Sequence, residues 1–576
     1  MSGCVWTTIT STRGRRFATS RFWRRPYRPS FERTALIKPN LRLVEPEKPA
    51  ARARLAGSAL FVMAATLGST ILGFSREVVN ARYYGTRWEM DAFLAATVIP
   101  MILFGVFNGA LVSALVPTFS EYIAHGKDEE AWRLANTIIN GLLIMLTVGA
   151  ILGYFLAPYY VPLIAHGFPA PEAGVTIRMT RWLMPSIVAV SISGVLSAIL
   201  NAHHRFRAAS LTGIALNAVT ITCVLLLHRQ IGIYAVVLGT ALGLFAQMLV
   251  QVPALLKTRK YRFTLDLHHP GLHRMWELLG PIIVGSAAGQ IALFFDRYFA
   301  STLSPGFMAG MNYATKLVNF PQQIFAAAIA TVIFPLLASQ FARENRIAVA
   351  GSVTLGLRLV NFITIPSVCA LMVLAYPMVQ TLFERGSFHA SSTALCAGLL
   401  PYAAVGLVAL AANVVLTRCA FACKEVSWTV AISVFTVVVN VLLSLLWLQP
   451  LGARGLLLAN SVSQTMQAVM LLVLVGRLVP RLDWRTLGVS ALKICISSAI
   501  MVGTLHWIAA LGVQPPHFFA ARAWFLFGQI AIGSLAFVAS ALVLNVEELT
   551  IALHLIMQKF ERNLPSPPEN RDVPIA

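Results

Sequence analysis

The stretch GFSREVVNARYYGTRWEMDAF, residues 73–93, closes an apolar run that begins near Ser58. A run of that length, at 1.5 Å per residue, can cross the roughly 30 Å hydrocarbon core of a bilayer as a helix. Four charged side chains nevertheless lie near its end: Arg76, Glu77, Arg82 and Asp91. A charge at the centre of a membrane helix costs about 2.5–3.5 kcal/mol and persists only where it is paired or faces water. The stretch therefore predicts membrane helices around a polar interior.

The composition extends this prediction to the whole chain. Of 576 residues, 57% are hydrophobic and only 12% are charged, and the mean hydropathy is +0.72. Soluble domains carry about 25% charged residues, so most of this chain must lie in lipid. We expect an all-α polytopic membrane protein with about 14 transmembrane helices. The expected spans are 58–83, 92–119, 134–157, 181–200, 208–228, 232–255, 277–299, 312–337, 353–374, 393–416, 427–448, 453–475, 487–510 and 523–546, with a short amphipathic piece at 376–384.

The distribution of cations predicts the orientation, because cytoplasmic loops carry an excess of Lys and Arg. Loops on the N-terminal side of the membrane hold sixteen Lys and Arg residues, against seven on the other side. Both termini are therefore expected in the cytoplasm. Residues 1–57 carry thirteen cations and three acids. We expect them to form a disordered basic tail that attracts anionic lipids, with no nucleic-acid partner.

The chain also repeats itself. Four pairs of landmarks lie 216 to 221 residues apart: VIP 98–100 with NFP 319–321, LVP 115–117 with IFP 333–335, LMP 183–185 with LLP 399–401, and the turn 165–168 with 384–388. The interval covers six spans, an even number, so the second copy has the orientation of the first. Such parallel repeats are known in transporters.

We therefore expect two six-helix lobes with substrate bound between them. The N-lobe is predicted at 58–255 and the C-lobe at 277–475. A C-terminal helix pair at 487–546 and a cytoplasmic tail at 547–576 follow.

Sequence signals for an enzyme are missing. There is no GxxxxGK[ST] phosphate loop, no HExxH, and no pair of carboxylates within the expected spans. Of the seven cysteines, Cys419 and Cys423 are four residues apart, but no His or acid pairs with them at metal-ligand spacing. We expect neither a catalytic centre nor a cofactor.

Several motifs together resemble the MurJ/MviN family of lipid II flippases. They are LGFSREVV and YYGTRWEMDAFLAATVIP near the start, LVPTFSEY, LNAHHRF at 200–206, GPIIVGSAAGQIALFFDRYFASTL at 280–303, NFPQQIFAAAIATVIFPLLA at 319–338 and LFERGSF at 382–388. The resemblance covers about residues 58–540. It implies a flippase that moves an undecaprenyl-diphosphate-linked peptidoglycan precursor, lipid II, across the bacterial cytoplasmic (inner) membrane by alternating access. We expect a monomer that is driven by a sodium gradient or the membrane potential.

The charged residues of the opening stretch lie at different depths in their expected membrane spans. Arg76 lies deeper in its span and is our first choice for binding the diphosphate. Arg82 lies near the helix end, where a long side chain reaches the interface, and Glu77 could pair with it only loosely. Asp91 opens the next helix and is either a helix cap or a gating residue.

The eighth expected span, 312–337, carries the second candidate cation. Lys316 has Asn312 four residues before it and Asn319 three residues after it. A cation flanked by amides suits a phosphate and a sugar. We therefore expect these three residues to bind substrate together with Arg76.

The resemblance also implies a sodium site. Some family members have one near their seventh and eleventh membrane helices, which correspond here to the expected spans 277–299 (helix 7) and 427–448 (helix 11). Asp296 on helix 7, with Thr436 and Asn440 one turn apart on helix 11, could supply the oxygen ligands that a hard cation takes.

The sequence leaves two other transport functions open. The family often has further cations on its first two helices, and an acid later on the second, at places where this chain has Thr70, Val98, Phe104 and Asn108. The substrate could therefore be another undecaprenyl-linked oligosaccharide, such as an exopolysaccharide or O-antigen unit. The MurJ/MviN family belongs to the larger multidrug/oligosaccharidyl-lipid/polysaccharide exporter superfamily, and a drug or cation exporter of that superfamily is the other alternative.

Overall fold

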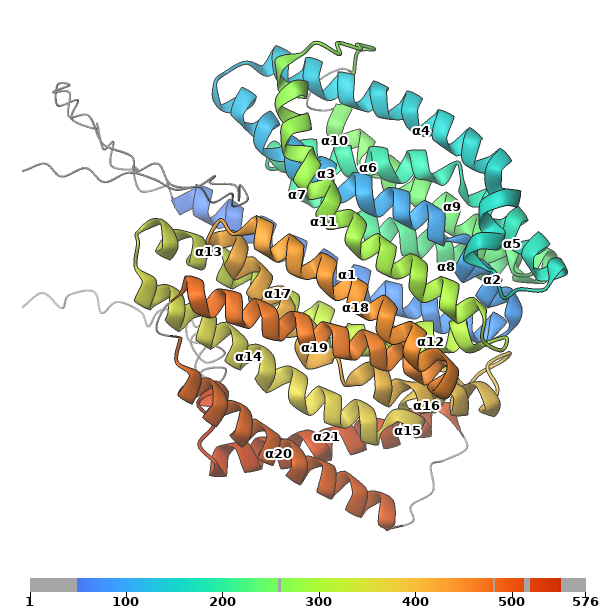
Figure 1. Cartoon of the computed structure of the whole chain (residues 1–576), viewed down its shortest axis with the longest axis vertical. Coiled ribbons are helices and arrows are strands. Elements are labelled where there is room, and N and C mark those ends of the chain that lie inside the picture. The colour runs from blue at the N-terminus through green and yellow to red at the C-terminus, as the bar shows by residue number, and fades with distance from the viewer. Residues whose placement is uncertain (1–48, 257–260, 480–481, 512–517, 551–576) are drawn as a thin grey trace, which may run out of the picture. The chain divides into compact units, whose positions relative to one another are not determined.

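The computed structural model describes residues 49–256, 261–479, 482–511 and 518–550, and every regular element in these ranges is helical (Figure 1). Contacts divide the chain into two units, Met1–Leu55 and Ala56–Ala576, and the second unit holds the helical bundle. The first helix, α1, begins at Pro49, so residues 49–57 are helical where we expected a disordered tail. Residues 1–48 and 551–576, which hold most of both predicted tails, lie outside the described ranges.

The N-lobe contains ten helices. They are α1 (Pro49–Tyr84), α2 (Trp88–Ala96), α3 (Val98–Ala124), α4 (Asp128–Ile164), α5 (Ala170–Leu183), α6 (Ser186–Ala202), α7 (Phe206–Ser210), α8 (Thr212–Ile231), α9 (Tyr234–Leu249) and α10 (Val252–Leu256). Two breaks have a local cause, because proline has no N–H for the carbonyl four residues earlier. Pro100 leaves the carbonyl of Ala96, the last residue of α2, without this hydrogen bond, and Pro185 separates α5 from α6.

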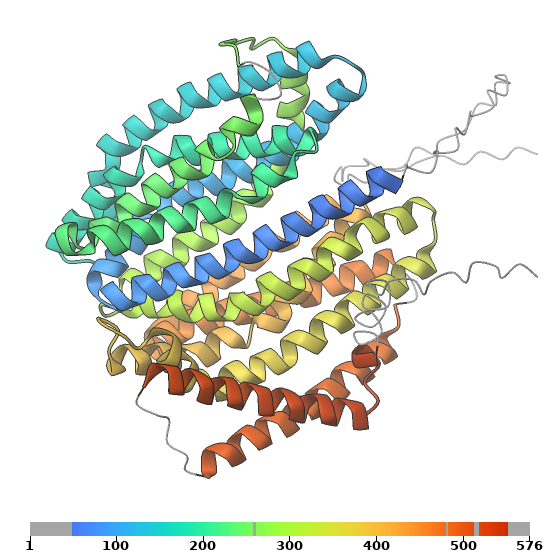
Figure 2. The ribbon, with the colours of Figure 1, turned by 180° about the vertical axis from the view of Figure 1, so that it is seen from behind.

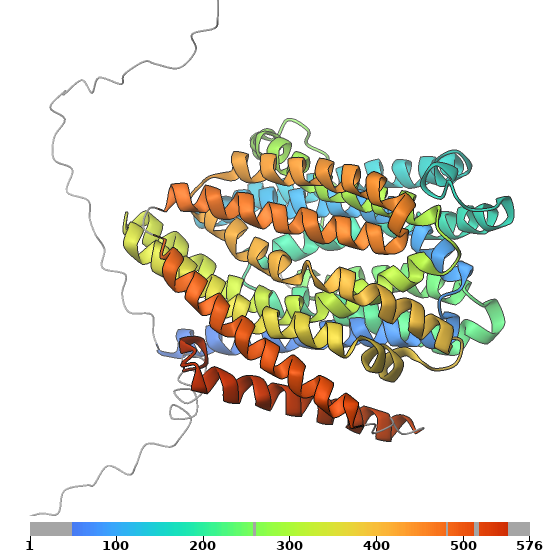
Figure 3. The ribbon, with the colours of Figure 1, turned by 60° about the horizontal axis from the view of Figure 1, so that its bottom comes forward.

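The C-lobe follows the same plan. It contains α11 (Pro270–Ser301), α12 (Phe307–Pro321), the π-helix η1 (Gln322–Ala326), α13 (Ala327–Ala342), α14 (Arg346–Val373), α15 (Ala375–Phe383), α16 (Ala390–Ala404), α17 (Leu407–Ala422), α18 (Val426–Leu451) and α19 (Ala453–Leu478). The amphipathic piece expected at 376–384 is α15. Two further helices, α20 (Trp484–Ala510) and α21 (Phe519–Val543), form the C-terminal pair, which packs on α14 and α15 (Figure 3).

Backbone conformations confirm the internal repeat. The pair α5 and α6 is bent by 41°, and the corresponding pair α16 and α17 is bent by 43°. Residues with positive φ also recur 218 to 221 positions apart: Gly85 with Gly306, Gly126 with Glu344, His204 with Lys424, and Gly232 with Gly452. Figure 2 shows α1, in dark blue, lying between the other N-lobe helices and the C-lobe.

Eight helices in the described residues are long and apolar enough to cross a membrane, or ten if each bent pair counts as one span. All fourteen expected spans fall on helices, but the number that cross the bilayer stays a prediction. One boundary needs refinement. The start of α11 packs Met275 into the core of α3, α4 and α6, so the first part of this helix belongs structurally to the N-lobe.

The largest buried cluster joins the two lobes at one end of the bundle. It includes Phe93 and Leu94 of α2 together with Met308 of α12 and Phe388. We call this the Asp91 end, and the opposite end, where α6 meets α7, the His203 end. The sequence predicts that the Asp91 end faces the periplasm.

Candidate functional site

A cavity of about 300 Å³ between the lobes contains both cations that the sequence singled out. Arg76 on α1 lines it from the N-lobe, and Lys316 on α12 lines it from the C-lobe. We call it the Arg76 cavity. The other lining residues are Ser69, Thr70, Gly73, Phe74, Glu77, Gly213, Leu216, Asn217, Phe320 and Gln323. Two cations on facing lobes can hold one anionic group between them.

Glu77 holds Arg76 in place. A guanidinium nitrogen of Arg76 donates to Glu77 Oε1 at 2.8 Å, and the Glu77 side chain is almost fully buried. Glu77 therefore pairs with Arg76 and not with Arg82, for which only a loose contact was possible. Residues five apart lie about 140° apart around a helix, so the two side chains diverge. Arg82 is exposed and contacts the ring of Tyr83, away from the cavity.

The helix geometry separates the three residues expected to act together on α12. Lys316 faces the Arg76 cavity, whereas Asn312 and Asn319 line a different one. At 3.6 residues per turn, the two asparagines lie about 20° apart and both lie roughly 40–60° to one side of Lys316. This offset leaves them on one broad face of the helix, but the packing around α12 divides them between two cavities.

Asp91 caps a helix of the other lobe. Its carboxylate accepts hydrogen bonds from the backbone N–H groups of Gly306 at 2.5 Å and Ala309 at 2.7 Å, at the N-terminus of α12. The first N–H groups of a helix have no partner within it, and an anion there is also favoured by the helix dipole. The expected cap of its own helix is wrong, because α2 begins at Trp88 and Asp91 lies one turn inside it. Asp91 caps α12 of the other lobe instead, and a gating role stays a prediction.

More hydrogen bonds between the lobes surround Asp91. The backbone N–H of Ser387 donates to Arg82 O at 2.8 Å, the Tyr313 hydroxyl donates to Gly85 O at 3.3 Å, and Thr86 and Ser392 share a hydrogen bond of 2.7 Å. These contacts close the Asp91 end. The Arg76 cavity extends from there along α1 toward Ser69, in the direction of the His203 end.

Glycines permit this close approach of the lobes. A Cβ on Gly386, whose φ is +59°, would lie 2.3 Å from the Arg82 carbonyl oxygen. A Cβ on Gly167, in the corresponding turn of the N-lobe, would lie 2.2 Å from Ser301 O. Both obstacles are backbone atoms of the opposite lobe, so a side chain at either position would force the lobes apart.

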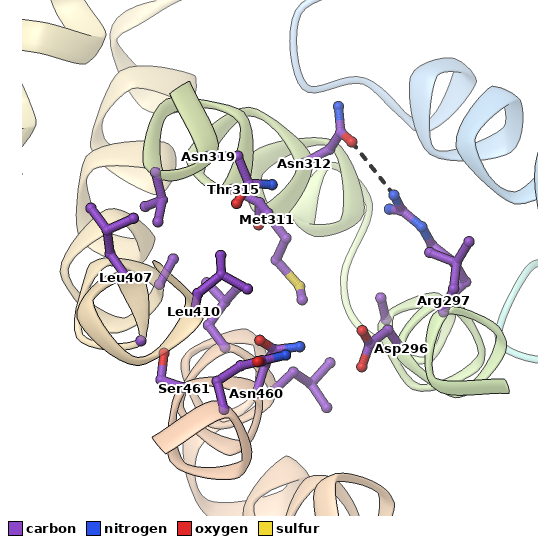
Figure 4. A pocket seen from close by; sticks show the side chains of 18 residues that line it. Asp296, Arg297, Met311, Asn312, Thr315, Asn319, Leu407, Leu410, Asn460 and Ser461 are labelled. Carbon is purple, nitrogen blue, oxygen red and sulfur yellow. Dashed lines mark hydrogen bonds between the residues drawn. The ribbon is translucent and has the colours of Figure 1, made fainter. Parts of the chain in front are cut away.

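A second cavity, of about 170 Å³, lies within the C-lobe and contains Asp296; we call it the Asp296 cavity. Figure 4 shows Asp296 and Arg297 on α11 across from Asn312 on α12 and Asn460 on α19. Arg297 donates to Asn312 Oδ1 at 3.5 Å, and Gln464 completes the polar lining.

The structure does not place the other two expected sodium ligands in this cavity. The Thr436 hydroxyl is hydrogen-bonded to backbone oxygens of its own helix, Ile432 O and Ser433 O. Asn440 is buried on α18, which packs against α11, and its Oδ1 has no hydrogen-bond partner in the described residues. Spacing along the sequence did not point to Asn460 and Gln464, which lie on α19 and line this cavity.

One ion-pair cluster had no signal in the sequence. Arg358 on α14 pairs with Glu547 at 2.8 Å and with Glu548, and Glu548 also accepts from Ser490 on α20. Burial alone would raise the pKa of Glu548, but the hydrogen bonds from Arg358 and Ser490 outweigh it and hold that pKa below its ordinary value. The cluster ties the C-terminal helix pair to the C-lobe at the His203 end.

Solved structures share this fold. One described as lipid II flippase MurJ in an inward closed conformation superposes with a TM-score of 0.73, at 24% identity over 84% of this chain and 98% of that chain. An inward-facing multidrug resistance MATE family transporter of the MOP superfamily gives 0.63, at 14% identity over 74% and 99%. The fold is therefore one that solved membrane transporters share.

Sequence comparison gives the family. The profile described as lipid II flippase MurJ matches residues 80–522, and the chain belongs to this family. A probable lipid II flippase MurJ from Vibrio cholerae serotype O1 is 30% identical over 86% of this chain and 97% of its own length. The lipid II flippase MurJ of Burkholderia cenocepacia is 26% identical over 78% and 89%. The resemblance seen in the sequence motifs is thus confirmed.

Proposed function

We propose that this protein flips lipid II across the bacterial cytoplasmic membrane, with both termini in the cytoplasm. One observation carries the proposal beyond family membership: Arg76 and Lys316 line a single cavity from opposite lobes. A diphosphate is the part of lipid II that two such cations would bind. Arg binds phosphate through a planar fork, whereas Lys acts as a compact point charge.

The closed Asp91 end supports a transport cycle that begins on the cytoplasmic side. With that end closed, the headgroup enters from the cytoplasmic side and its phosphates neutralise the two cations. Breaking the Asp91 cap and the turn contacts then opens the periplasmic side, while the lipid tail stays in the bilayer. The process needs no covalent chemistry, in keeping with a transporter rather than an enzyme.

A sodium gradient is a candidate driving force, with the membrane potential as the alternative. The Asp296 cavity offers a carboxylate and the amide oxygens of Asn460 and Gln464, and Asn440 carries a buried oxygen without a partner among the described residues on the adjacent helix. Oxygen ligands suit a hard cation. Asp296, Asn460 and Gln464 would hold Na⁺, whose charge would offset that of Asp296.

Rescue of a bacterium depleted of its own lipid II flippase tests the function. The wild-type chain should restore growth, and Arg76→Ala or Lys316→Ala should abolish rescue while the protein stays in the membrane. Arg82→Ala is the matched control, since Arg82 lies on the same helix but is exposed, and it should still rescue. Normal rescue by both cavity variants would refute the role of the cation pair.

The outcome with the wild-type chain separates the remaining alternatives. Failure to rescue despite good expression would favour a different undecaprenyl-linked oligosaccharide as substrate. Transport of a cationic dye would favour a drug exporter, although a cavity with two cations and one carboxylate, Glu77, keeps a net positive charge and is poorly matched to a cationic substrate.

A further inference from the structure

The Arg76 cavity has an uncharged part that the diphosphate does not account for. Beyond Arg76 and Lys316, its wall continues with two amide side chains, Asn217 on α8 and Gln323 on η1, and with the ring of Phe320. Sugar-binding sites need hydrogen-bonding groups in fixed positions together with apolar surface. The lining thus changes from charges to amides within one cavity.

Gln323 lies at a local departure from α-helical geometry. Pro321 cannot donate to the carbonyl of Leu317, and the chain continues as the π-helix η1. Single π-helical turns inside longer helices are frequently found at functional sites. Gln323 is exposed and makes no hydrogen bond to any described residue, so both its donor and its acceptor are available to a ligand.

Asn217 is held in one orientation by its own hydrogen bonds. Its Nδ2 donates to Ser69 O at 3.2 Å and to Gly213 O at 2.9 Å, which joins α8 to α1. Both donors of the amide are then used, and Oδ1 accepts no hydrogen bond from the described residues. This buried side chain therefore presents a fixed acceptor, suited to a hydroxyl or an amide N–H of a ligand.

The position of these groups relative to the cations fits a sugar joined to a diphosphate. Gln323 follows Lys316 by seven residues, about two helical turns or roughly 10 Å along the axis. Phe320 lies between them in sequence, and its ring contacts that of Phe74 with centroids 5.3 Å apart. An apolar ring beside two amides can pack against the C–H face of a sugar while its hydroxyl and acetamido groups bind the amides.

We propose that Asn217 and Gln323 form a sugar subsite of the Arg76 cavity, which binds the N-acetylated sugar next to the diphosphate. This proposal rests on the proposed function. Arg76 and Lys316 then bind any polyprenyl diphosphate. The amides of Asn217 and Gln323 make the protein prefer a polyprenyl diphosphate that carries an acetamido sugar. A specificity-determining role for Gln323 follows directly.

Binding by the purified full-length protein in nanodiscs tests the subsite, with lipid II and undecaprenyl diphosphate as the two probes. Gln323→Leu should weaken lipid II binding about fivefold, within a range of about 2- to 13-fold, the loss expected for one net hydrogen bond. It should leave undecaprenyl diphosphate binding unchanged. Gln322→Leu is the matched control. It changes the same residue type in the same π-helix at a position that does not line the cavity, and neither probe should respond.

Asn217→Leu should show the same selectivity, but it also removes the contact between α8 and α1. Gln323→Leu is therefore the deciding variant. Equal weakening for both probes, or unchanged lipid II binding, would overturn the sugar subsite. Binding of undecaprenyl diphosphate that is insensitive to Arg76→Ala would instead overturn the cation pair, and with it the proposed function.

Discussion

The carboxylate of Asp91 on α2 accepts a hydrogen bond of 2.5 Å from the backbone N–H of Gly306, across the boundary between the two lobes. Gly306 begins the turn into α12, the helix that carries Lys316. One acidic side chain of the N-lobe thus fixes the end of the helix that supplies the C-lobe cation. Closure of the Asp91 end and the position of the cation are therefore linked.

Replacing Asp91 should open this end. Asp91→Ala removes two hydrogen bonds between the lobes, each of which contributes about 0.5–1.5 kcal/mol. Spin labels at Arg87 and His389, which are exposed on opposite lobes, should report a longer and broader distance distribution than in the wild type. Asp91→Asn should fall between the two, because one oxygen acceptor remains. An unchanged distribution in Asp91→Ala would show that the cap does not hold the seal.

Adding a methyl group at the turn glycines should have the same effect for a steric reason. Gly386→Ala and Gly167→Ala each place a Cβ within 2.3 Å of a backbone oxygen of the other lobe. A strain of about 2 kcal/mol in the closed state alone would change the ratio of closed to open protein about 30-fold. The same spin labels measure the shift. Gly126→Ala is the control, since Gly126 also has positive φ but a Cβ there meets nothing within 4 Å. It should leave the distance distribution unchanged.

The ion pair at the base of the C-terminal helices should make stability depend on acidity. The pKa of Glu548 is lower in the folded protein than its ordinary value of 4.5. Its contribution to the free energy of unfolding is therefore complete above about pH 4.5 and is lost as the pH falls through the folded-state pKa. The wild-type unfolding midpoint in detergent should exceed that of Glu548→Gln at about pH 7, and the two should converge in acid. Parallel curves for the two proteins would argue against this linkage.

Sodium should stabilise the protein through Asp296. A ligand that binds only the folded state stabilises it by RT ln(1 + [L]/Kd) and so raises the unfolding midpoint. We expect Na⁺ to raise the midpoint of the wild type relative to equal K⁺, and Asp296→Asn to abolish that difference. Thr436→Val should keep it, because Thr436 is hydrogen-bonded within α18 and does not line the Asp296 cavity. A sodium response retained in Asp296→Asn would exclude this site.

The candidate site was only partly accessible from sequence. Arg76 and Lys316 could be found because a charge in an apolar helix is costly and therefore conspicuous. Asn217 and Gln323 gave no comparable signal, because amides are common and their position depends on which helices meet. Glu547 and Glu548 lie far along the chain from Arg358, and nothing in the local sequence joins them.

The sequence by itself determined the helices and the repeat of one lobe as two, and its prolines explain the breaks that the structure has at Pro100 and Pro185. These follow from local causes: apolar length, a missing proline N–H, and spacing along the chain. Only the tertiary structure decided that Glu77 pairs with Arg76, that Asp91 caps α12, and that Lys316 and Asn312 face different cavities. The physical reason is that a side chain's partner depends on the rotation of its helix and on the packing of segments hundreds of residues apart, which hydropathy and spacing do not encode.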